Sequence, residues 1–254
     1  MTFTGERLHE GDALFGVDLL RHRAPYAFAI ALAGKGRVLD LGCGGGYGTA
    51  ELAGALPRVV GLDRIPPDRT SRRSNIDWVR ADLRSVPLRE SLFDTITSFQ
   101  VIEHLEDPAI YLQIIARLLT PDGVALITTP NILTSDRINP FHVHEYEAEE
   151  LRSRLSPHFG QVEMLGVAAS GTVSHYFEER LRRIRRIMRI DPLGLRNLLP
   201  RPLIEWLFAR GARLVRRGIR EGDGGLPEAT LDDFPIGPAD PRDLDLLAVC
   251  RDPR

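Results

Sequence analysis

One short stretch of the chain constrains its fold more than any other, because an apolar run leads directly into a cluster of glycines. Arg37–Leu41 is typical of a buried strand, and from Tyr47 the apolar residues take the spacing of a helix. Between them, residues 42–46 read Gly-Cys-Gly-Gly-Gly. Glycines in a strand-to-helix turn let a ligand approach the backbone closely and reach its N–H groups. The stretch therefore predicts a ligand site at the end of a strand in an α/β fold.

The rest of the chain continues this alternation of strands and helices. Strands are predicted at residues 37–41, 58–62, 78–80, 93–99, 124–129, 161–167 and 244–250. Helices are predicted at residues 19–33, 47–56, 108–119 and 148–155, and residues 120–123 form a turn cluster before the fifth strand. This order predicts a Rossmann-like α/β fold, with a seven-stranded, mostly parallel sheet and helices on both faces.

The composition of the 254 residues excludes several classes of protein. Hydrophobic residues make up 43% and charged residues 27%, which argues against a disordered, fibrous or membrane-bundle chain. The two cysteines, Cys43 and Cys250, are too few for a disulfide framework. No stretch resembles a signal peptide or reaches the roughly 20 apolar residues that span a bilayer. We therefore expect a cytoplasmic protein, and its net charge of −2 does not favour a nucleic-acid partner.

Arginines are concentrated in one segment of the chain. Residues 180–220 hold thirteen of them against two acids, Asp191 and Glu205. Apolar residues between these arginines predict two amphipathic helices, at 181–190 and 203–215, inserted before the last strand. Three uses of this insertion stay open. It caps the substrate or forms the subunit face of a homodimer, it lies on anionic lipid at a membrane surface, or it contacts an anionic substrate or RNA.

An acid before the glycines distinguishes this turn from a dinucleotide-binding turn. The fingerprint G-x-G-x-x-G would need glycine at position 47, where Tyr47 stands. Asp40 instead precedes Gly42 by two residues, and the pattern resembles motif I of class I S-adenosylmethionine-dependent methyltransferases. Further segments resemble that family: Gly61–Asp63, Ala81–Leu83, Phe93–Leu105 and Leu118–Gly123.

The resemblance implies S-adenosylmethionine as the cofactor and suggests how it is held. In the family, the strand-end acid and the glycine backbone hold the methionine part, and an acid after the third strand meets the adenine amino group. Asp63 ends the second strand, where a carboxylate can accept both ribose hydroxyl protons. The predicted cofactor-binding residues are Asp40, Gly42, Gly44, Tyr47, Asp63, Asp82, Leu83 and Gln100.

The start of the chain carries a narrower resemblance. Thr4-Gly5-Glu6-Arg7 is similar to the start of a bacterial subgroup that methylates sugars in polysaccharide pathways, where the arm folds over the cofactor. A tail docked on the protein surface is the alternative. We accordingly divide the chain into an arm and helix that cover the cofactor (1–34), a methyltransferase core (35–170 and 241–254) and the basic insertion (171–240).

Two clusters of acids and histidines follow the fourth and fifth strands, at the sheet edge where ligands gather. Glu103-His104 and residues 141–146 resemble the metal site of polyprenyl-quinone O-methyltransferases and small-RNA 2′-O-methyltransferases, which carry E-x-x-E-H after the fourth strand. Gln100 stands here in place of the first glutamate, and His144 or Glu145 is a candidate to replace it. The resemblance implies Glu103, His104 and His142 as ligands of a divalent metal, with Mg²⁺ favoured and Mn²⁺ as the alternative.

The same residues are the candidates for catalysis. His144 is predicted to accept the proton of the acceptor hydroxyl, because histidine side chains exchange protons near neutral pH, and Glu103 and His104 complete the predicted catalytic set. The alternative is that Glu103 and His104 shape the pocket without a metal. The predicted reaction is O-methylation of a sugar or oligosaccharide hydroxyl in bacterial polysaccharide or glycoconjugate biosynthesis. The alternatives are a quinone or lipid-linked phenol at the membrane surface, and an RNA 2′-hydroxyl.

Overall fold

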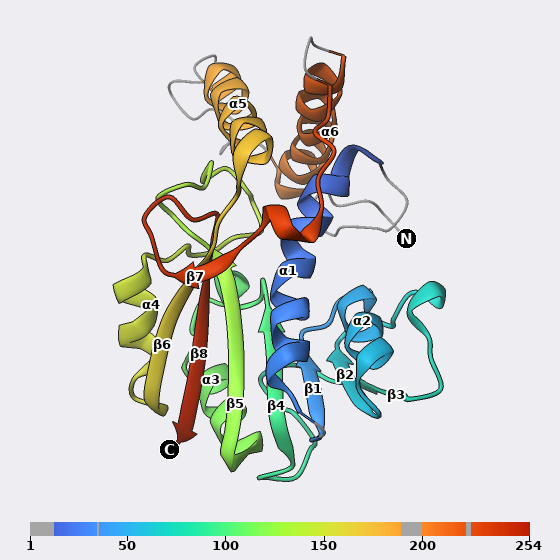
Figure 1. Ribbon diagram of the computed structural model, residues 1–254, viewed down its shortest axis with the longest axis vertical. Helices are drawn as coiled ribbons and strands as arrows, with labels where there is room; N and C mark the ends of the chain where they lie inside the picture. Colours follow the sequence, from blue (N-terminus) through green and yellow to red (C-terminus); the bar gives the residue numbers. More distant parts are fainter. Residues whose placement is uncertain (1–12, 35, 189–199, 222–224) are drawn as a thin grey trace.

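The protein is built on one sheet of eight strands, in the order β3-β2-β1-β4-β5-β8-β6-β7 (Figure 1). The computed structural model describes residues 13–34, 36–188, 200–221 and 225–254. The segment Thr4–Arg7 and its predicted contact with the cofactor therefore lie outside the described residues. The predicted Rossmann-like α/β fold is confirmed.

The strands run parallel from β3 to β5, and the last part of the sheet is antiparallel. β5 pairs with β8 in antiparallel fashion, and β8 pairs in the same way with β6. Because two antiparallel steps restore the original direction, β6 points the same way as β5. The strands are β1 Val38–Leu41, β2 Val59–Asp63, β3 Ile76–Arg80, β4 Phe93–Phe99, β5 Leu119–Pro130, β6 Phe159–Val167, β7 Ile236–Pro238 and β8 Asp245–Pro253.

Helices cover both faces of the sheet because alternate residues of the buried strands point to opposite sides. On one face, α1 (Gly16–Leu32) and α2 (Tyr47–Ala55) belong to the apolar cluster that contains Val38 of β1. On the other face, α3 (Ala109–Leu118) and α4 (Ala148–Leu155) belong to the apolar cluster that contains Leu39 of β1. Short 3₁₀ helices complete the chain: η1 Ala13–Phe15, η2 Arg69–Ser71, η3 Ile102–His104 and η5 Leu231–Asp233.

Two details differ from the sequence prediction. The sheet has eight strands rather than seven, because Ile236–Pro238 pairs with the end of β6 at the sheet edge. The predicted turn cluster at 120–123 lies inside β5 as a bulge. Phe93 pairs with Leu119, but Thr95, two residues on, already pairs with Val124. The extra residues of β5 therefore leave the ladder without ending the strand.

The basic insertion forms two long helices, α5 (Gly171–Met188) and α6 (Arg201–Arg220), which stand above the sheet in Figure 1. They are joined to α1 by an apolar cluster that includes Tyr176 and Phe177 of α5 and Val215 and Ile219 of α6. β7 also belongs to the range 171–240, so part of the predicted insertion pairs with the sheet of the core. Among the described residues, no helix combines the length and the apolar character needed to cross a bilayer.

A buried ion network fixes the insertion to α1. Asp18 is 5% exposed and accepts a hydrogen bond from Arg180 of α5 at 2.5 Å and one from Arg216 of α6 at 3.0 Å. Burial alone would raise the pKa of Asp18, but the two guanidinium groups outweigh it and hold the pKa well below its usual range. One carboxylate thus ties both inserted helices to the helix that covers the sheet.

Candidate functional site

The glycine turn between β1 and α2 has a left-handed backbone conformation at three of its residues. Gly42, Gly44 and Gly46 have φ angles of +81°, +55° and +85°, a region that residues with a Cβ rarely enter. The N–H groups of Gly42 and Cys43 both donate to the carbonyl of Leu62 on β2, at 2.8 and 3.1 Å. A Cβ at Gly44 would meet nothing within 4 Å, so the turn faces open space there. This is the cradle that the sequence predicts for the cofactor.

Asp63 ends β2 directly beside this cradle. Its carboxylate accepts hydrogen bonds from the N–H of Gly44 at 2.9 Å and from the N–H of Ile65 at 3.0 Å. The side chain is half-buried. A carboxylate has about four acceptor directions, so two bonds from the turn leave it able to accept the hydroxyl protons of a ribose.

Asp40, two residues before the turn, is buried beneath it. It is 1% exposed and accepts hydrogen bonds from the hydroxyls of Thr49 at 2.6 Å, Thr97 at 3.0 Å and Tyr26 at 3.3 Å. Burial raises the pKa of Asp40 to about 6, and the three hydroxyls limit the rise. This carboxylate therefore acts on the shape of the turn, through α1, α2 and β4, and is closed off from solvent.

Tyr26 reaches Asp40 by passing over Gly48. A Cβ at Gly48 would lie 2.0 Å from the Tyr26 ring, so only glycine permits this approach. The Tyr26 ring also meets the ring of Tyr47 edge-on, with centroids 5.9 Å apart. The hydrogen bond to Asp40 gives Tyr26 a place in the site that sequence reasoning missed, since the residue reads as core packing. Thr49 and Thr97 are equally hard to identify from the sequence, because each is a single hydroxyl residue within an apolar element.

Asp82 and Leu83 follow β3, the neighbour of β2 in the sheet. The N–H of Ala81 donates to the carbonyl of Asp63 at 3.2 Å, so the two predicted acids lie on adjacent strand ends. Asp82 is exposed on the surface and makes a two-pronged contact with the guanidinium of Arg84, at 3.0 and 2.9 Å. Leu83 packs against the main apolar cluster of the core.

Gln100 follows β4 in an unusual backbone conformation, with a φ of +56°. Its side-chain amide donates to Asp245 of β8 at 3.2 Å, and Arg21 of α1 donates to the same carboxylate oxygen at 2.9 Å. Sequence reasoning missed Arg21 and Asp245, because they are separated by more than 200 residues and neither lies in a motif. Asp245, itself held by Arg21, thereby fixes the side chain of Gln100.

Glu103, His104 and His142 form one compact group. One ligand atom from each residue lies within 4.8 Å of those of the others. The N–H groups of Val143 and His144 both donate to the carbonyl of Glu103, at 2.7 and 3.2 Å, and so fold the loop after β5 back onto η3. The structure therefore brings together the three residues that the sequence predicts as metal ligands.

Hydrogen bonds set the tautomers of the two histidines in this group. Nδ1 of His104 lies 2.9 Å from the carbonyl oxygen of Phe141, which can only accept, so Nδ1 carries the proton. Nδ1 of His142 donates to Glu145 at 2.7 Å, and its Nε2 lies 2.8 Å from the amide nitrogen of Asn139. In the neutral rings Nε2 is thus the acceptor on both histidines. Bonds of this kind to a carbonyl or carboxylate orient metal-binding histidines.

The Glu103 carboxylate is the least satisfied polar group of the site. The residue is 0% exposed, and neither of its carboxylate oxygens has a hydrogen-bond partner among the described residues. Burial raises the pKa of Glu103 to about 7, against the opposing effect of His104 and His142. A buried carboxylate without a partner is costly, so this group fits a site that receives a proton or a cation.

His144, the predicted proton acceptor, lies apart from this group. Its Nε2 is 2.7 Å from Glu150 of α4, its side chain is 46% exposed, and its ring meets Tyr146 edge-on. In an extended segment, side chains two residues apart point to the same side. His142 and His144 would therefore share a face if the loop were straight. The turn of the backbone onto Glu103 separates them, and the assignment of His144 remains a prediction.

The donor set of the site fits the ligands that the sequence predicts. The glycine turn leaves open space at Gly44, and Asp63 places a carboxylate beside it, as a nucleoside cofactor needs. Glu103 and two imidazole acceptors fit a divalent cation, which would replace the hydrogen bond between Asn139 and His142. Both fits rest on the residues present.

Comparison with known proteins shows the family of the chain. The model of a family described as "Methyltransferase domain" matches residues 17–189. A probable S-adenosylmethionine-dependent methyltransferase of Mycolicibacterium smegmatis is 37% identical over 177 residues, 66% of this chain and 68% of that protein. A similarly named protein of Mycobacterium tuberculosis is 34% identical over 61% of this chain, which spans 60% of its length.

More distant relatives and solved structures extend the comparison. A ubiquinone biosynthesis O-methyltransferase of Bordetella pertussis is 34% identical over 109 residues, 40% of this chain and 45% of that enzyme. A SAM-dependent methyltransferase of Thermotoga maritima shares the fold over 98% of both chains, with a TM-score of 0.60 and 11% identity. The N-methyltransferase NodS of Bradyrhizobium japonicum, solved with S-adenosylhomocysteine, has a TM-score of 0.52 and 23% identity, over 64% of this chain and 87% of that one.

Proposed function

The chain belongs to the class I S-adenosylmethionine-dependent methyltransferases, and we propose that it methylates a hydroxyl oxygen activated at Glu103, His104 and His142. The observation that carries this proposal is the buried Glu103 carboxylate, whose oxygens have no hydrogen-bond partner among the described residues. It follows β4, next to the strand that leads into the glycine turn. A Cβ on Gly42 would lie 2.6 Å from Val101, two residues before Glu103, so the two parts of the site adjoin.

The residues of the chain supply binding, alignment and proton transfer. When bound, S-adenosylmethionine would supply the methyl group, which passes from its sulfonium sulfur to the acceptor oxygen with S-adenosylhomocysteine as the leaving group. The glycine turn and Asp63 would hold the cofactor, and Gln100, fixed by Asp245, follows the neighbouring strand β4. Positioning of two reactants accounts for much of the acceleration of such a displacement. The hydroxyl proton passes to Glu103, through the carboxylate oxygen that does not ligate the cation described below.

A divalent cation is part of this proposal. Glu103, His104 and His142 would hold it, and when bound it supplies Lewis-acid polarisation that lowers the pKa of the acceptor hydroxyl. Phe141 and Glu145 would orient the two imidazoles toward it through their Nδ1 protons. Mixed carboxylate and imidazole ligands accept several divalent metals, among which we propose Mg²⁺ first and Mn²⁺ second.

We propose a sugar hydroxyl of an oligosaccharide or glycoconjugate as the acceptor. The resemblance of Thr4–Arg7 to sugar-methylating enzymes supports this choice. A phenolic hydroxyl of a quinone precursor is the second candidate, and the similarity to ubiquinone biosynthesis O-methyltransferases favours it. Sugars and catechols share a pair of neighbouring hydroxyls, which one cation can hold together.

The experiment that tests the proposal is transfer of a labelled methyl group from S-adenosylmethionine to a panel of acceptors. The panel holds mono- and oligosaccharides, a catechol and a short RNA, each with and without chelator. Transfer to a sugar oxygen that stops on chelation, with cofactor affinity unchanged in calorimetry, is the expected result. Transfer only to nitrogen would overturn the proposal. Full activity in metal-free enzyme would remove the cation and leave Glu103 and His104 as a proton-transfer pair.

A further inference from the structure

Helix α6 carries apolar residues on two faces, and the described parts of the chain bury only one of them. On the inner face, Val215 and Ile219 are buried in the cluster that joins α6 to α1 and α5, and Phe208 meets Phe141 edge-on at 6.4 Å. On the outer face, four large apolar residues are 40–65% exposed: Leu203, Trp206, Leu207 and Leu214. These four follow one side of the helix, since they recur at intervals of three, four and seven residues.

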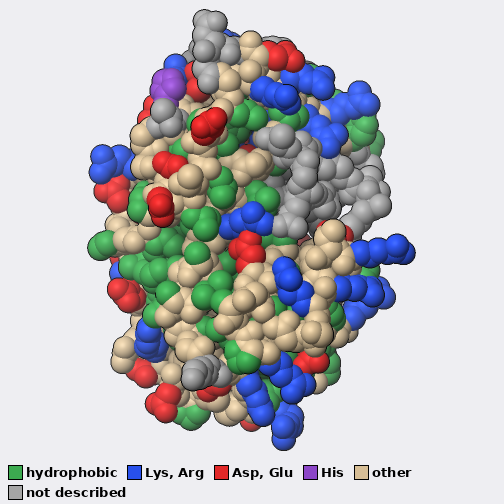
Figure 2. Space-filling view, turned by 45° about the vertical axis from the view of Figure 1, so that its right-hand side comes forward, with side chains coloured by type: hydrophobic (Ala, Val, Ile, Leu, Met, Phe, Trp, Pro, Cys, Tyr) green, Lys and Arg blue, Asp and Glu red, His purple; other side chains and the backbone are tan. Residues whose placement is uncertain are grey.

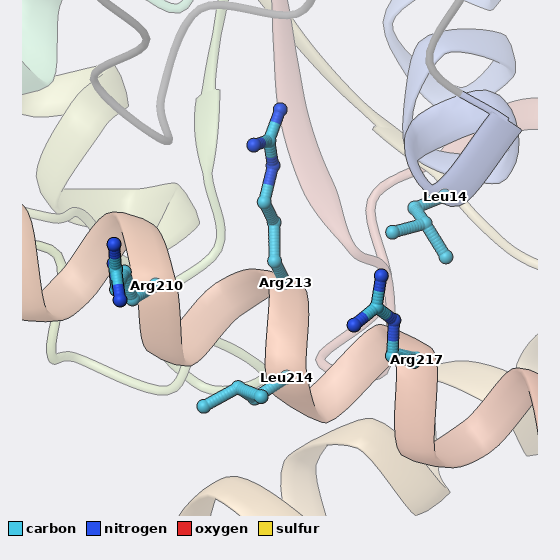
Figure 3. A pocket seen from close by; sticks show the side chains of 5 residues that line it. All are labelled: Leu14, Arg210, Arg213, Leu214 and Arg217. Atoms are coloured by element: carbon cyan, nitrogen blue, oxygen red, sulfur yellow. The ribbon is translucent and has the colours of Figure 1, made fainter.

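Arginines surround this outer face, which we define as Leu203, Trp206, Leu207 and Leu214. The guanidinium of Arg210 lies over the ring of Trp206, 4.4 Å from its centroid. Arg210, Arg213 and Arg217 line an open hollow of 380 Å³ with Leu14 and Leu214, and Arg213 extends away from the helix (Figure 3). On the other side of Leu214, Arg183 and Arg186 of α5 line a second hollow of 250 Å³.

The charge of this region is strongly one-sided. Residues 171–188 and 201–220 together contain eleven arginines and three glutamates, although the whole chain has a net charge of −2. Asp18 engages Arg180 and Arg216 on the inner side, so the arginines around the outer face are a separate set. In the space-filling view, basic side chains gather among hydrophobic ones at the upper right, where α6 comes forward (Figure 2).

We propose that the outer face of α6 docks on the surface of an anionic lipid bilayer. An amphipathic helix rich in arginine, with tryptophan and leucine on the apolar side, lies in the plane of a membrane interface. The leucines and Trp206 enter the boundary between headgroups and acyl chains, while Arg210 and Arg217 contact lipid phosphates. The hydrophobic and the ionic parts of the surface are then both satisfied by one partner.

Two other partners fit this surface less well. In a symmetric dimer the same patch meets itself, so the arginines of one copy would face those of the other. An RNA would neutralise the arginines, but its phosphate backbone offers nothing for Leu203, Leu207 and Leu214. Only an anionic lipid surface complements the charge and the apolar stripe together.

The docking surface stands at the same end of the protein as the proposed acceptor site. Phe208 of α6 contacts Phe141, whose carbonyl accepts the Nδ1 proton of His104 and whose neighbour is His142. Docking through α6 would thus hold the His142 loop near the bilayer. The inference does not depend on the reaction proposed above, because it concerns binding of the protein alone.

The test is co-sedimentation of the full chain with vesicles of phosphatidylcholine alone or mixed with phosphatidylglycerol. We expect binding only to the anionic vesicles, weakened by salt, with a blue shift of the Trp206 emission that is lost in Trp206→Phe. Each arginine near such a surface contributes about fivefold in affinity, so Arg210→Gln combined with Arg217→Gln should weaken binding by about 25-fold. Leu207→Ser combined with Leu214→Ser should abolish the emission shift.

Matched controls separate this surface from general stickiness. Ile110 of α3 is also 50% exposed, and Ile110→Ser should leave vesicle binding unchanged. Arg72 and Arg89 are exposed arginines outside the insertion, and replacing both with glutamine should weaken binding far less than the α6 pair. Circular dichroism and cofactor binding confirm that each variant folds. Absence of binding to anionic vesicles overturns the proposal. If the protein binds no vesicles but forms a dimer that is lost in the leucine variant, the outer face is a subunit interface instead. If it binds no vesicles but forms a salt-sensitive RNA complex that is lost in the arginine variant, the partner is RNA.

Discussion

Two carboxylates on neighbouring strands of this sheet are equally buried and differ in what surrounds them. Asp40, on β1, is 1% exposed and accepts hydrogen bonds from three hydroxyls. Glu103, just after β4, is 0% exposed, and neither carboxylate oxygen has a partner among the described residues. The satisfied carboxylate belongs to the scaffold of the cofactor turn. The Glu103 carboxylate, whose oxygens lack partners among the described residues, can instead accept a proton or a ligand. The hydrogen bonding of a buried carboxylate is therefore a better guide to its function than its burial.

The strongest test of this comparison is Glu103→Gln. The amide keeps the size of the side chain but cannot accept the hydroxyl proton or hold a cation as a carboxylate does. We expect kcat to fall by about 10² to 10⁴, the usual contribution of general acid–base catalysis, while the cofactor Kd changes little. Single-turnover kinetics and calorimetry on the same preparation separate the two effects. Glu106→Gln, on the exposed side of the same loop, is the control and should keep normal kcat.

The second test concerns stability and addresses Asp40. Burial raises its pKa from 3.8 to about 6, so the folded protein takes up this proton more readily than the unfolded chain. The group therefore favours folding below about pH 4, and this contribution is lost as the pH rises toward 6. A shift of this size corresponds to about 3 kcal/mol. Asp40→Asn cannot titrate, so urea unfolding from pH 4 to 7 should show the wild type losing stability relative to the variant. Parallel curves for the two proteins would mean that Asp40 is not desolvated as the structure shows.

The third test addresses the exposed edge of the cofactor turn. Asp63→Ala removes the acceptor for the ribose hydroxyls and the bond to the Gly44 N–H. Hydrogen bonds to a charged group contribute about 1.5–3 kcal/mol, so cofactor affinity should fall by about 10- to 150-fold. Asp77→Ala, on the adjacent strand β3, removes an exposed carboxylate paired with Arg58 and serves as control. Unchanged affinity of the folded Asp63 variant in calorimetry would refute the assignment.

The difference between these regions also explains what the sequence predicts well. Strands with strong apolar patterns lie where predicted, as Phe93–Phe99 does, because burial on both faces determines them. β7 was missed because it has three residues, two of them Gly237 and Pro238, and no alternation to detect. It exists only because the end of β6 offers a free edge.

The candidate site shows the same division. Its motif residues lie at the ends of strands, so the sheet brings them together whatever path the loops take. The partners of Asp40 and Gln100 come from distant elements, and single residues such as Tyr26, Thr97 and Asp245 carry no local signal. The loop after β5 is the least predictable part. Its path depends on two N–H groups that donate to the carbonyl of Glu103, and this path decides which histidines join the cluster.

The smallest expected effect, and the sharpest test of that loop, is His144→Ala. The sequence predicts this residue as the proton acceptor, whereas the structure pairs it with Glu150 and leaves its side chain 46% exposed. If Glu103 takes the proton, kcat should change by less than about threefold, because the exposed His144 side chain then contacts no reacting atom. His142→Ala is the matched comparison, because it removes the neighbouring histidine that does join Glu103 and should lower kcat far more. A large loss of kcat in His144→Ala, with a shifted pH–rate profile and an unchanged cofactor Kd, would restore His144 as the base. It would also require the loop to turn His144 toward the acceptor when substrate binds.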